Sequence, residues 1–159
     1  MPSVYYTIWV ALALFVAGEV GRARVPARVG WPWRASAAGL VLAIVHTIRS
    51  FDLVHGWSHD DAVLKTAMQT RAVFGVAFGA GVYVNYLFFA VWLADLAGWR
   101  RAGGVHERPR PMTLALQAFY LVIIVNAAIV FASGWRRLLG VVLVMVLLAA
   151  WGRWLRMTK

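Results

Sequence analysis

The sequence predicts an all-helical bundle that crosses a membrane about five times, with one short segment at the membrane surface. Apolar residues make up 62% of the chain and charged residues only 14%, and the mean hydropathy is +0.72. Soluble domains carry about 25% charged residues. Five apolar runs alternate with arginine-rich connectors, and a helix needs about 20 apolar residues to cross the membrane core. We therefore expect residues 1–159 to form a single transmembrane helical domain.

The expected spans follow the apolar runs in chain order. No basic residue precedes the first run and no small-residue cleavage site follows it, which favours a retained helix over a signal peptide. Ser58, with Asp61 three residues later, resembles a capping box, so a helix should begin near His59. Residues 60–71 are mixed in polarity and are expected to be an interfacial lead-in. The five spans are residues 4–20, 35–54, 72–97, 112–133 and 138–155.

The lysines and arginines predict how the bundle is oriented, because cytoplasmic loops carry more of them. The connectors after the first and third spans and the C-terminal tail hold eleven, against five on the other side. We expect the N-terminus outside, the C-terminus inside and the turn at residues 54–62 facing outward. The net charge of +10 then indicates anionic lipids as partners, and without a basic and aromatic stacking surface nucleic acid is not expected as one.

The stretch VHGWSHDDA, residues 54–62, contains the candidate metal ligands. If the second span continued through it, Asp52, His55 and His59 would share one helix face, and Asp60 offers another carboxylate. Imidazole and carboxylate suit zinc, copper or iron. The alternative is a polar hinge, because Gly56 favours a helix break. Cysteine is absent, which excludes thiolate ligands.

Haem is less expected than a single transition metal ion. His46 is the only histidine deep within an expected span, and no other span offers a histidine partner for a second axial bond. A haem bound wholly within one chain is therefore not favoured, and one shared between subunits stays open.

Polar residues within three spans form a candidate intramembrane layer. Such residues usually face the interior of a bundle. One interpretation is a polar path or pocket that opens outward and suits a proton relay, a quinone headgroup or a small solute. The other is a set of interhelical hydrogen bonds that only hold the bundle together. The layer consists of His46, Asn85, Tyr86 and Asn126.

Two further patterns concern packing and charge. Gly75 and Gly79, with Gly81 close by, match the spacing that lets two helix backbones approach closely, within one chain or in a homodimer. Charged residues near the inner helix ends predict interfacial ion pairs. The expected pairs are Glu19 with Arg22, and Asp95 with Arg100 and Arg101.

The stretch from His55 to Asp95 resembles a pattern in small bacterial multi-span membrane proteins of unknown function. It carries His-Gly-Trp-Ser-His at residues 55–59, a glycine-rich helix start and Asn-Tyr-Leu-Phe at residues 85–88, and it covers about a quarter of the chain. The resemblance implies a bacterial inner-membrane protein and no particular activity.

Three function classes fit these patterns. The first is an integral subunit that scaffolds or completes a larger membrane assembly, possibly redox-linked, with other subunits or further copies of itself as partners. The second is an outward-facing metal site for redox chemistry or metal handling, and the third is a channel or transporter that uses the polar layer. No nucleotide loop, nucleophile elbow or zinc-protease helix occurs, which argues against the familiar soluble enzymes and leaves a membrane enzyme open.

Overall fold

A computed structural model of the chain confirms the all-helical fold. It describes residues 2–22, 24, 29–102 and 108–157, and within these ranges it contains six α-helices, one π-helical segment and no strand. The elements are α1 (Pro2–Arg22), α2 (Trp31–Leu53), α3 (His59–Phe74), α4 (Gly81–Ala102), α5 (Arg110–Val125), the π-helical segment η2 (Asn126–Val130) and α6 (Trp135–Met157).

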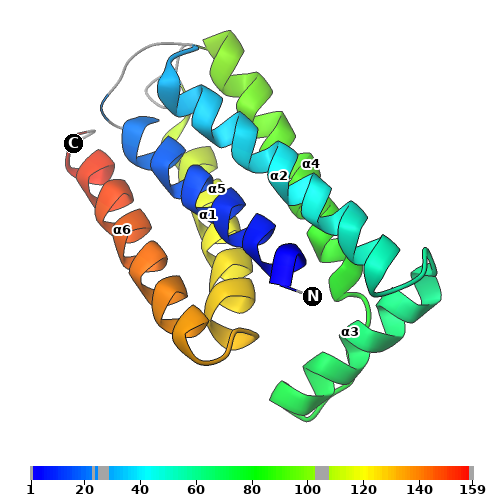
Figure 1. Cartoon of the computed structure of the whole chain (residues 1–159). Helices are drawn as coiled ribbons and strands as arrows, with labels where there is room; N and C mark the ends of the chain where they lie inside the picture. The colour runs from blue at the N-terminus through cyan, green and yellow to red at the C-terminus, as the bar shows by residue number, and fades with distance from the viewer. Residues whose placement is uncertain (1, 23, 25–28, 103–107, 158–159) are drawn as a thin grey trace.

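Five of the helices run alongside one another, and α3 lies across one end of the bundle (Figure 1). Helix α1 contacts α2 and α6, α2 contacts α4, and α6 also contacts α5 and η2. Helix α1 begins toward the end of the bundle where α3 lies, and α6 finishes at the opposite end (Figure 1). We call the first the α3 end and the second the far end.

The protein is an integral membrane protein. In the described part of the chain, four helical stretches are long and apolar enough to cross a membrane. They are Trp31–Leu53, Gly81–Arg101, Arg110–Val130 and Trp135–Arg156. The first stretch begins four residues earlier than the expected span 35–54, because Pro32 is tolerated in the first helical turn. The last two stretches match the expected spans 112–133 and 138–155, with bounds shifted by a few residues. The second stretch matches the expected span 72–97 only in part.

The expected third span, residues 72–97, was wrong at its beginning. Residues 60–71 belong to a complete 16-residue helix, α3, which starts where predicted: the Ser58 side chain accepts a hydrogen bond from the Asp61 backbone N–H at 3.2 Å. Gly75 then ends this helix in the left-handed conformation, with φ of +76°, which glycine adopts without steric cost. The next helix begins only at Gly81.

This break also corrects the predicted glycine packing face. Gly75 is a helix cap, Gly79 lies in the connection against Val63, and Gly81 opens α4, so the three do not share one helix. Helices approach closely at other glycines. Gly18 lies against Ser36, Gly39 lies against the Ala11 carbonyl and Trp92, and Gly140 lies against Ala128.

Aromatic rings fill the centre of the bundle between its two ends. Phe15 of α1 lies edge-on to both Trp92 of α4 and Tyr120 of α5, with ring centroids 5.0 Å apart in each pair. Phe88 contacts Trp92 and Tyr120 as well. All four side chains are buried. We call them the aromatic layer, and they separate the space near α3 from the far end.

Replacing Gly39 with alanine should destabilise the bundle. The added methyl group would lie 2.8 Å from the Ala11 carbonyl oxygen and 3.2 Å from the Trp92 ring, and overpacking of this kind costs about 1–3 kcal/mol. Gly98→Ala is the matched control, because nothing lies within 4 Å of that position; it should be neutral or stabilising by up to about 1 kcal/mol. Thermal unfolding in detergent compares the two, and equal midpoints would show that α1 and α2 are not in close contact at Gly39.

Candidate functional site

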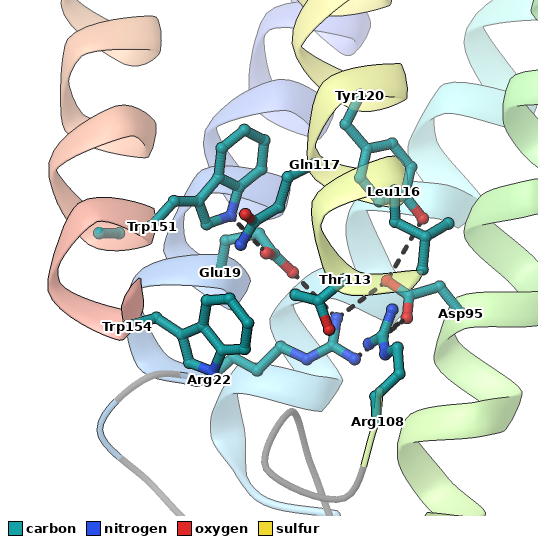
Figure 2. A pocket seen from close by; sticks show the side chains of 11 residues that line it. Glu19, Arg22, Asp95, Arg108, Thr113, Leu116, Gln117, Tyr120, Trp151 and Trp154 are labelled. Carbon is teal, nitrogen blue, oxygen red and sulfur yellow. Dashed lines mark hydrogen bonds and ion pairs between the residues drawn. The ribbon is translucent and has the colours of Figure 1, made fainter. Parts of the chain in front are cut away.

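Four charged side chains meet at the far end of the bundle and form the inner ion-pair cluster (Figure 2). Arg22 donates two hydrogen bonds to the Asp95 carboxylate, at 2.9 and 3.0 Å, and one to Glu19 at 3.2 Å. Arg108 lies 2.7 Å from Asp95 Oδ1, which also accepts from Arg22. Two acids face two bases, so the cluster is neutral when all four groups are ionised. Each side chain is at most 12% exposed.

Neighbouring aromatic side chains complete the hydrogen bonding of this cluster. The Tyr120 hydroxyl donates to Asp95 at 3.3 Å, and the Trp151 indole N–H donates to Glu19 at 2.7 Å. The Arg22 guanidinium lies 4.3 Å from the centre of the Trp99 ring. The cluster thereby joins α1, α4, α5, α6 and Arg108, which lies two positions before α5. Buried charges are tolerated when they are paired and hydrogen-bonded in this way.

A small void adjoins the Arg22 guanidinium, whose Nε has no partner within the described residues. Its volume is about 20 Å³, and its lining includes Thr113 and Gln117 (Figure 2). A void of this size holds a single water molecule. This void therefore has space for a water and not for a larger ligand.

The predicted partners of Asp95 were wrong, while the Glu19–Arg22 pair is confirmed as a buried ion pair. Asp95 pairs with Arg22 and Arg108, and both Arg100 and Arg101 are exposed. Residues five and six positions apart do not face each other on a helix, whereas those three or four apart do. Helical spacing could have excluded Arg100 and Arg101, but the contacts between distant helices required the fold.

The structure does not bring the candidate metal ligands together. Helix α2 ends at Leu53, and Gly56 and Trp57 both have positive φ, so the helix face assumed for the ligands is broken. Each side chain has its own partner: Asp52 accepts from the Trp57 indole at 3.1 Å, His55 Nδ1 lies 2.8 Å from Asp61, and His59 Nε2 lies 3.2 Å from the Tyr83 hydroxyl. Asp60 begins α3. Within the described ranges, no group of three His, Cys, Asp or Glu side chains is placed to hold a metal ion.

A cavity of about 220 Å³ lies inside the bundle near α3, and we call it the outer cavity. Helices α1 to α5 and η2 all contribute to its wall. Leu12, Phe88 and Ile124 line it on the side of the aromatic layer, and each is at most 5% exposed. The polar lining consists of His46, Thr47, Ser50, His55, Thr66, Asn85 and Tyr86, with no Asp, Glu, Lys or Arg in the lining.

Three of the four residues of the predicted polar layer line this cavity. His46 Nδ1 lies 3.2 Å from the Thr7 hydroxyl, and Tyr86 hydrogen-bonds His59 at 3.4 Å. Asn85 has no hydrogen-bond partner among the described residues. Because α4 begins at Gly81, Asn85 lies about 6 Å from the N-terminal end of its helix, at 1.5 Å per residue. It is nearer to that end than it would be in the expected span of residues 72–97.

A wider groove lies beside the outer cavity, and we call it the side groove. It has a volume of about 520 Å³ and runs between α3, the 75–80 connection, α4, α5 and η2. Asn126, the fourth residue of the predicted layer, lines this groove and donates to the Val122 carbonyl at 2.8 Å. It begins the π-helical segment, a conformation frequent at functional sites. The layer is therefore divided between two neighbouring spaces.

Sequence reasoning missed the hydroxyl groups of the outer cavity and the far-end partners of Asp95. Ser50 follows His46 by four residues and Thr47 by three, so it shares a helix face with each of them, which was a usable signal. Thr66 comes from a helix that the sequence assigned to a lead-in segment. Arg108 and Tyr120 gave no local signal, because their partner lies on another helix.

Replacing Asp95 with asparagine should strongly destabilise the protein. The change leaves Arg22 and Arg108 with Glu19 as the one remaining acid of the cluster, and an uncompensated buried charge costs about 3–5 kcal/mol. Asp52→Asn, which changes an exposed hydrogen bond, should cost less than about 1 kcal/mol. Unfolding midpoints in detergent compare them.

A compensating variant makes this prediction sharper. Asp95→Asn combined with Arg108→Gln restores one acid and one base, so it should recover part of the stability lost in the single variant. If Asp95→Asn is as stable as Asp52→Asn, the cluster does not hold the helices together.

Asp61 should titrate below its ordinary range. Hydrogen bonds from Lys65 and His55, each 2.8 Å from the carboxylate, lower the pKa of Asp61 below its ordinary value of 3.8. The ionised form is favoured by folding, so this stabilisation is present above pH 3.8 and is lost as the pH falls through the lowered pKa. Lys65→Met should raise the pKa, and Arg71→Met, a change of the same kind on the same helix, should not. NMR titration measures both, and an unchanged pKa in Lys65→Met would contradict the assignment.

Comparison with known proteins identifies no relative of this chain. No family model matches it, and neither a curated protein nor a solved structure does so either. Its function is therefore argued from the two spaces and the cluster alone.

Proposed function

We propose that this protein is a bacterial inner-membrane protein that binds a small uncharged molecule in the outer cavity. The observation that carries the proposal is the cavity itself, whose wall combines apolar side chains with the exposed amide of Asn85 and other uncharged polar groups. A ligand with a hydrogen-bonding oxygen can accept a hydrogen bond from that amide.

The lining of the outer cavity supports an uncharged ligand. Its hydroxyl, imidazole and amide groups donate and accept hydrogen bonds, but no Asp, Glu, Lys or Arg faces the space. An ionised ligand would lose its hydration there without a fixed opposite charge, which is unfavourable in an apolar medium. Ligand sites commonly combine an apolar wall with a few placed polar groups, as this one does.

The close packing of side chains toward the far end favours a binding protein over a channel. Phe15, Tyr120 and their neighbours in the aromatic layer are packed together, and the buried ion-pair cluster lies beyond Tyr120. A continuous pore would have to pass through the aromatic layer and the ion-pair cluster, and the side chains of both would have to move apart. The channel or transporter predicted from the polar layer would therefore require a second conformation, whereas binding requires only the cavity.

We propose that this cavity faces the outer side of the membrane. We propose that α1 is a fifth span beside the four apolar ones, because it packs along α2 and α6 within the bundle (Figure 1). The excess of lysine and arginine then puts the N-terminus and α3 outside and the C-terminus inside. Helix α3 would lie at the outer surface, over the cavity.

The metal site and the scaffolding role, the two other predicted functions, differ in how well they agree with these contacts. A metal site at residues 52–60 would require Asp52, His55 and His59 to leave their separate partners and converge. A scaffolding role in a larger assembly is compatible with ligand binding, and it stays a prediction.

Protein isolated gently from its membrane should carry the ligand. We expect a small molecule at close to one per chain, detected by mass spectrometry of a solvent extract. Thr47→Phe places a ring in the cavity and should release the molecule. Val45→Phe, two positions away on the exposed side of the same helix, should retain it. Equal retention in both variants, or no bound molecule in the wild type, would overturn the proposal.

A further inference from the structure

The outer cavity and the side groove adjoin each other. They share four lining residues: Thr66 of α3, Asn85 of α4, Ile123 of α5 and Ala127 of η2. Asn85 thus borders both the polar space and the groove. A ligand that occupied both spaces would pass beside these four residues.

Size supports a ligand that occupies both spaces. Sites for small organic molecules have volumes of about 300–1,000 Å³. The outer cavity, at about 220 Å³, falls below that range by itself, whereas the cavity and the groove of about 520 Å³ together fall within it. The cavity fits one ring with its substituents, and the groove fits an attached chain.

The two spaces differ in chemistry as the two ends of an amphiphile differ. Aromatic side chains stand beside the polar groups of the cavity, namely Phe51, Tyr86, Phe88 and Phe89. These favour a flat ring, which can stack on them. Hydrogen-bond donors come from the Asn85 amide on α4 and from the Ser50 hydroxyl on α2. A flat, uncharged ring with hydrogen-bond-accepting oxygens meets all of these conditions.

The side groove offers the apolar surface that a chain requires, and it opens toward the bilayer. Phe74, Val76, Phe78 and Val122 line it and are each more than half exposed. These side chains lie where a membrane helix meets lipid, since no other described element covers them. Phe74 and Phe131 contact each other at 6.0 Å between ring centroids and lie at the α3 end of the groove. A membrane-dissolved ligand can therefore enter sideways.

We infer that the ligand is a quinone-type amphiphile, with its ring in the outer cavity beside Asn85 and its apolar chain in the side groove. This inference rests on the proposed function and names the ligand class of the same site. It concerns binding alone. Phospholipids fit less well, because their phosphate groups prefer Arg and Lys, and neither lines the cavity.

Binding of matched probes to the full chain in nanodiscs tests the inference. The probes are a benzoquinone with a decyl chain, the same benzoquinone without the chain, and decanol. We expect the decyl benzoquinone to bind at least about tenfold more tightly than either part. Asn85→Leu should weaken binding of both benzoquinones about tenfold, because it removes the donor at the shared wall.

A second variant tests the groove independently of the ring. Ala127→Phe places a ring at the junction, where the alanine is exposed and no core contact is disturbed. It should reduce the affinity for the decyl benzoquinone to that for the bare ring. Val45→Phe should bind like the wild type, and the unfolding midpoint of each variant shows whether it is folded.

The outcomes distinguish this inference from the proposed function. If the decyl benzoquinone and the bare ring bind equally, the groove holds no chain and the inference is overturned, while the cavity remains a binding site. If decanol binds as tightly as the decyl benzoquinone, the ring is not recognised and the inference is again overturned. If no benzoquinone binds but the isolated protein carries another molecule that Thr47→Phe releases, the ligand class is wrong and the proposed function stands. If nothing is bound in any test, both fail.

Discussion

The ion pair between Arg22 and Asp95 is the contact on which the rest of the bundle depends. The two residues are 73 positions apart in the chain, and two hydrogen bonds fix the angle between them as well as their separation. A charged group at a membrane helix end has few alternatives to a paired state, since the surrounding medium cannot solvate it fully. Glu19 and Arg108 add one acid and one base to this pair, so the cluster of four stays neutral. The helices that carry these residues therefore meet at the far end.

Tight packing at the far end allows open space at the other. The neutral cluster and the aromatic layer hold α1, α4, α5 and α6 together through side chains that interlock. Near α3, polar side chains line a cavity between the helices. Thr70 fixes the connection after α3, because its hydroxyl accepts from the Phe78 backbone N–H at 2.7 Å. The helices around the cavity are therefore held in place although the cavity separates them.

Features that depend on a single helix were predictable from the sequence, and features that depend on two helices were not. The apolar runs gave the fold class, and Ser58 with Asp61 gave the start of α3. The break after Phe74 was missed, although Gly75 is a common helix-ending residue, because the apolar residues continue across it. His46 and Asn85 were recognised as polar residues in spans, but the hydrogen bond to Thr7 and the division of the layer between two spaces come from tertiary packing.

Hydrogen bonding distinguishes the residues that hold this bundle together from those available to a ligand. Asp95 accepts bonds from three side chains, and Asn126 bonds a carbonyl of its own helix, so both are satisfied by the protein. Asn85 is exposed and has no such bond to a described residue, so its amide is available to a molecule bound in the proposed site. Because Asn85 lines both the cavity and the groove, a ligand that uses this amide has to present a polar atom at the wall that the two spaces share.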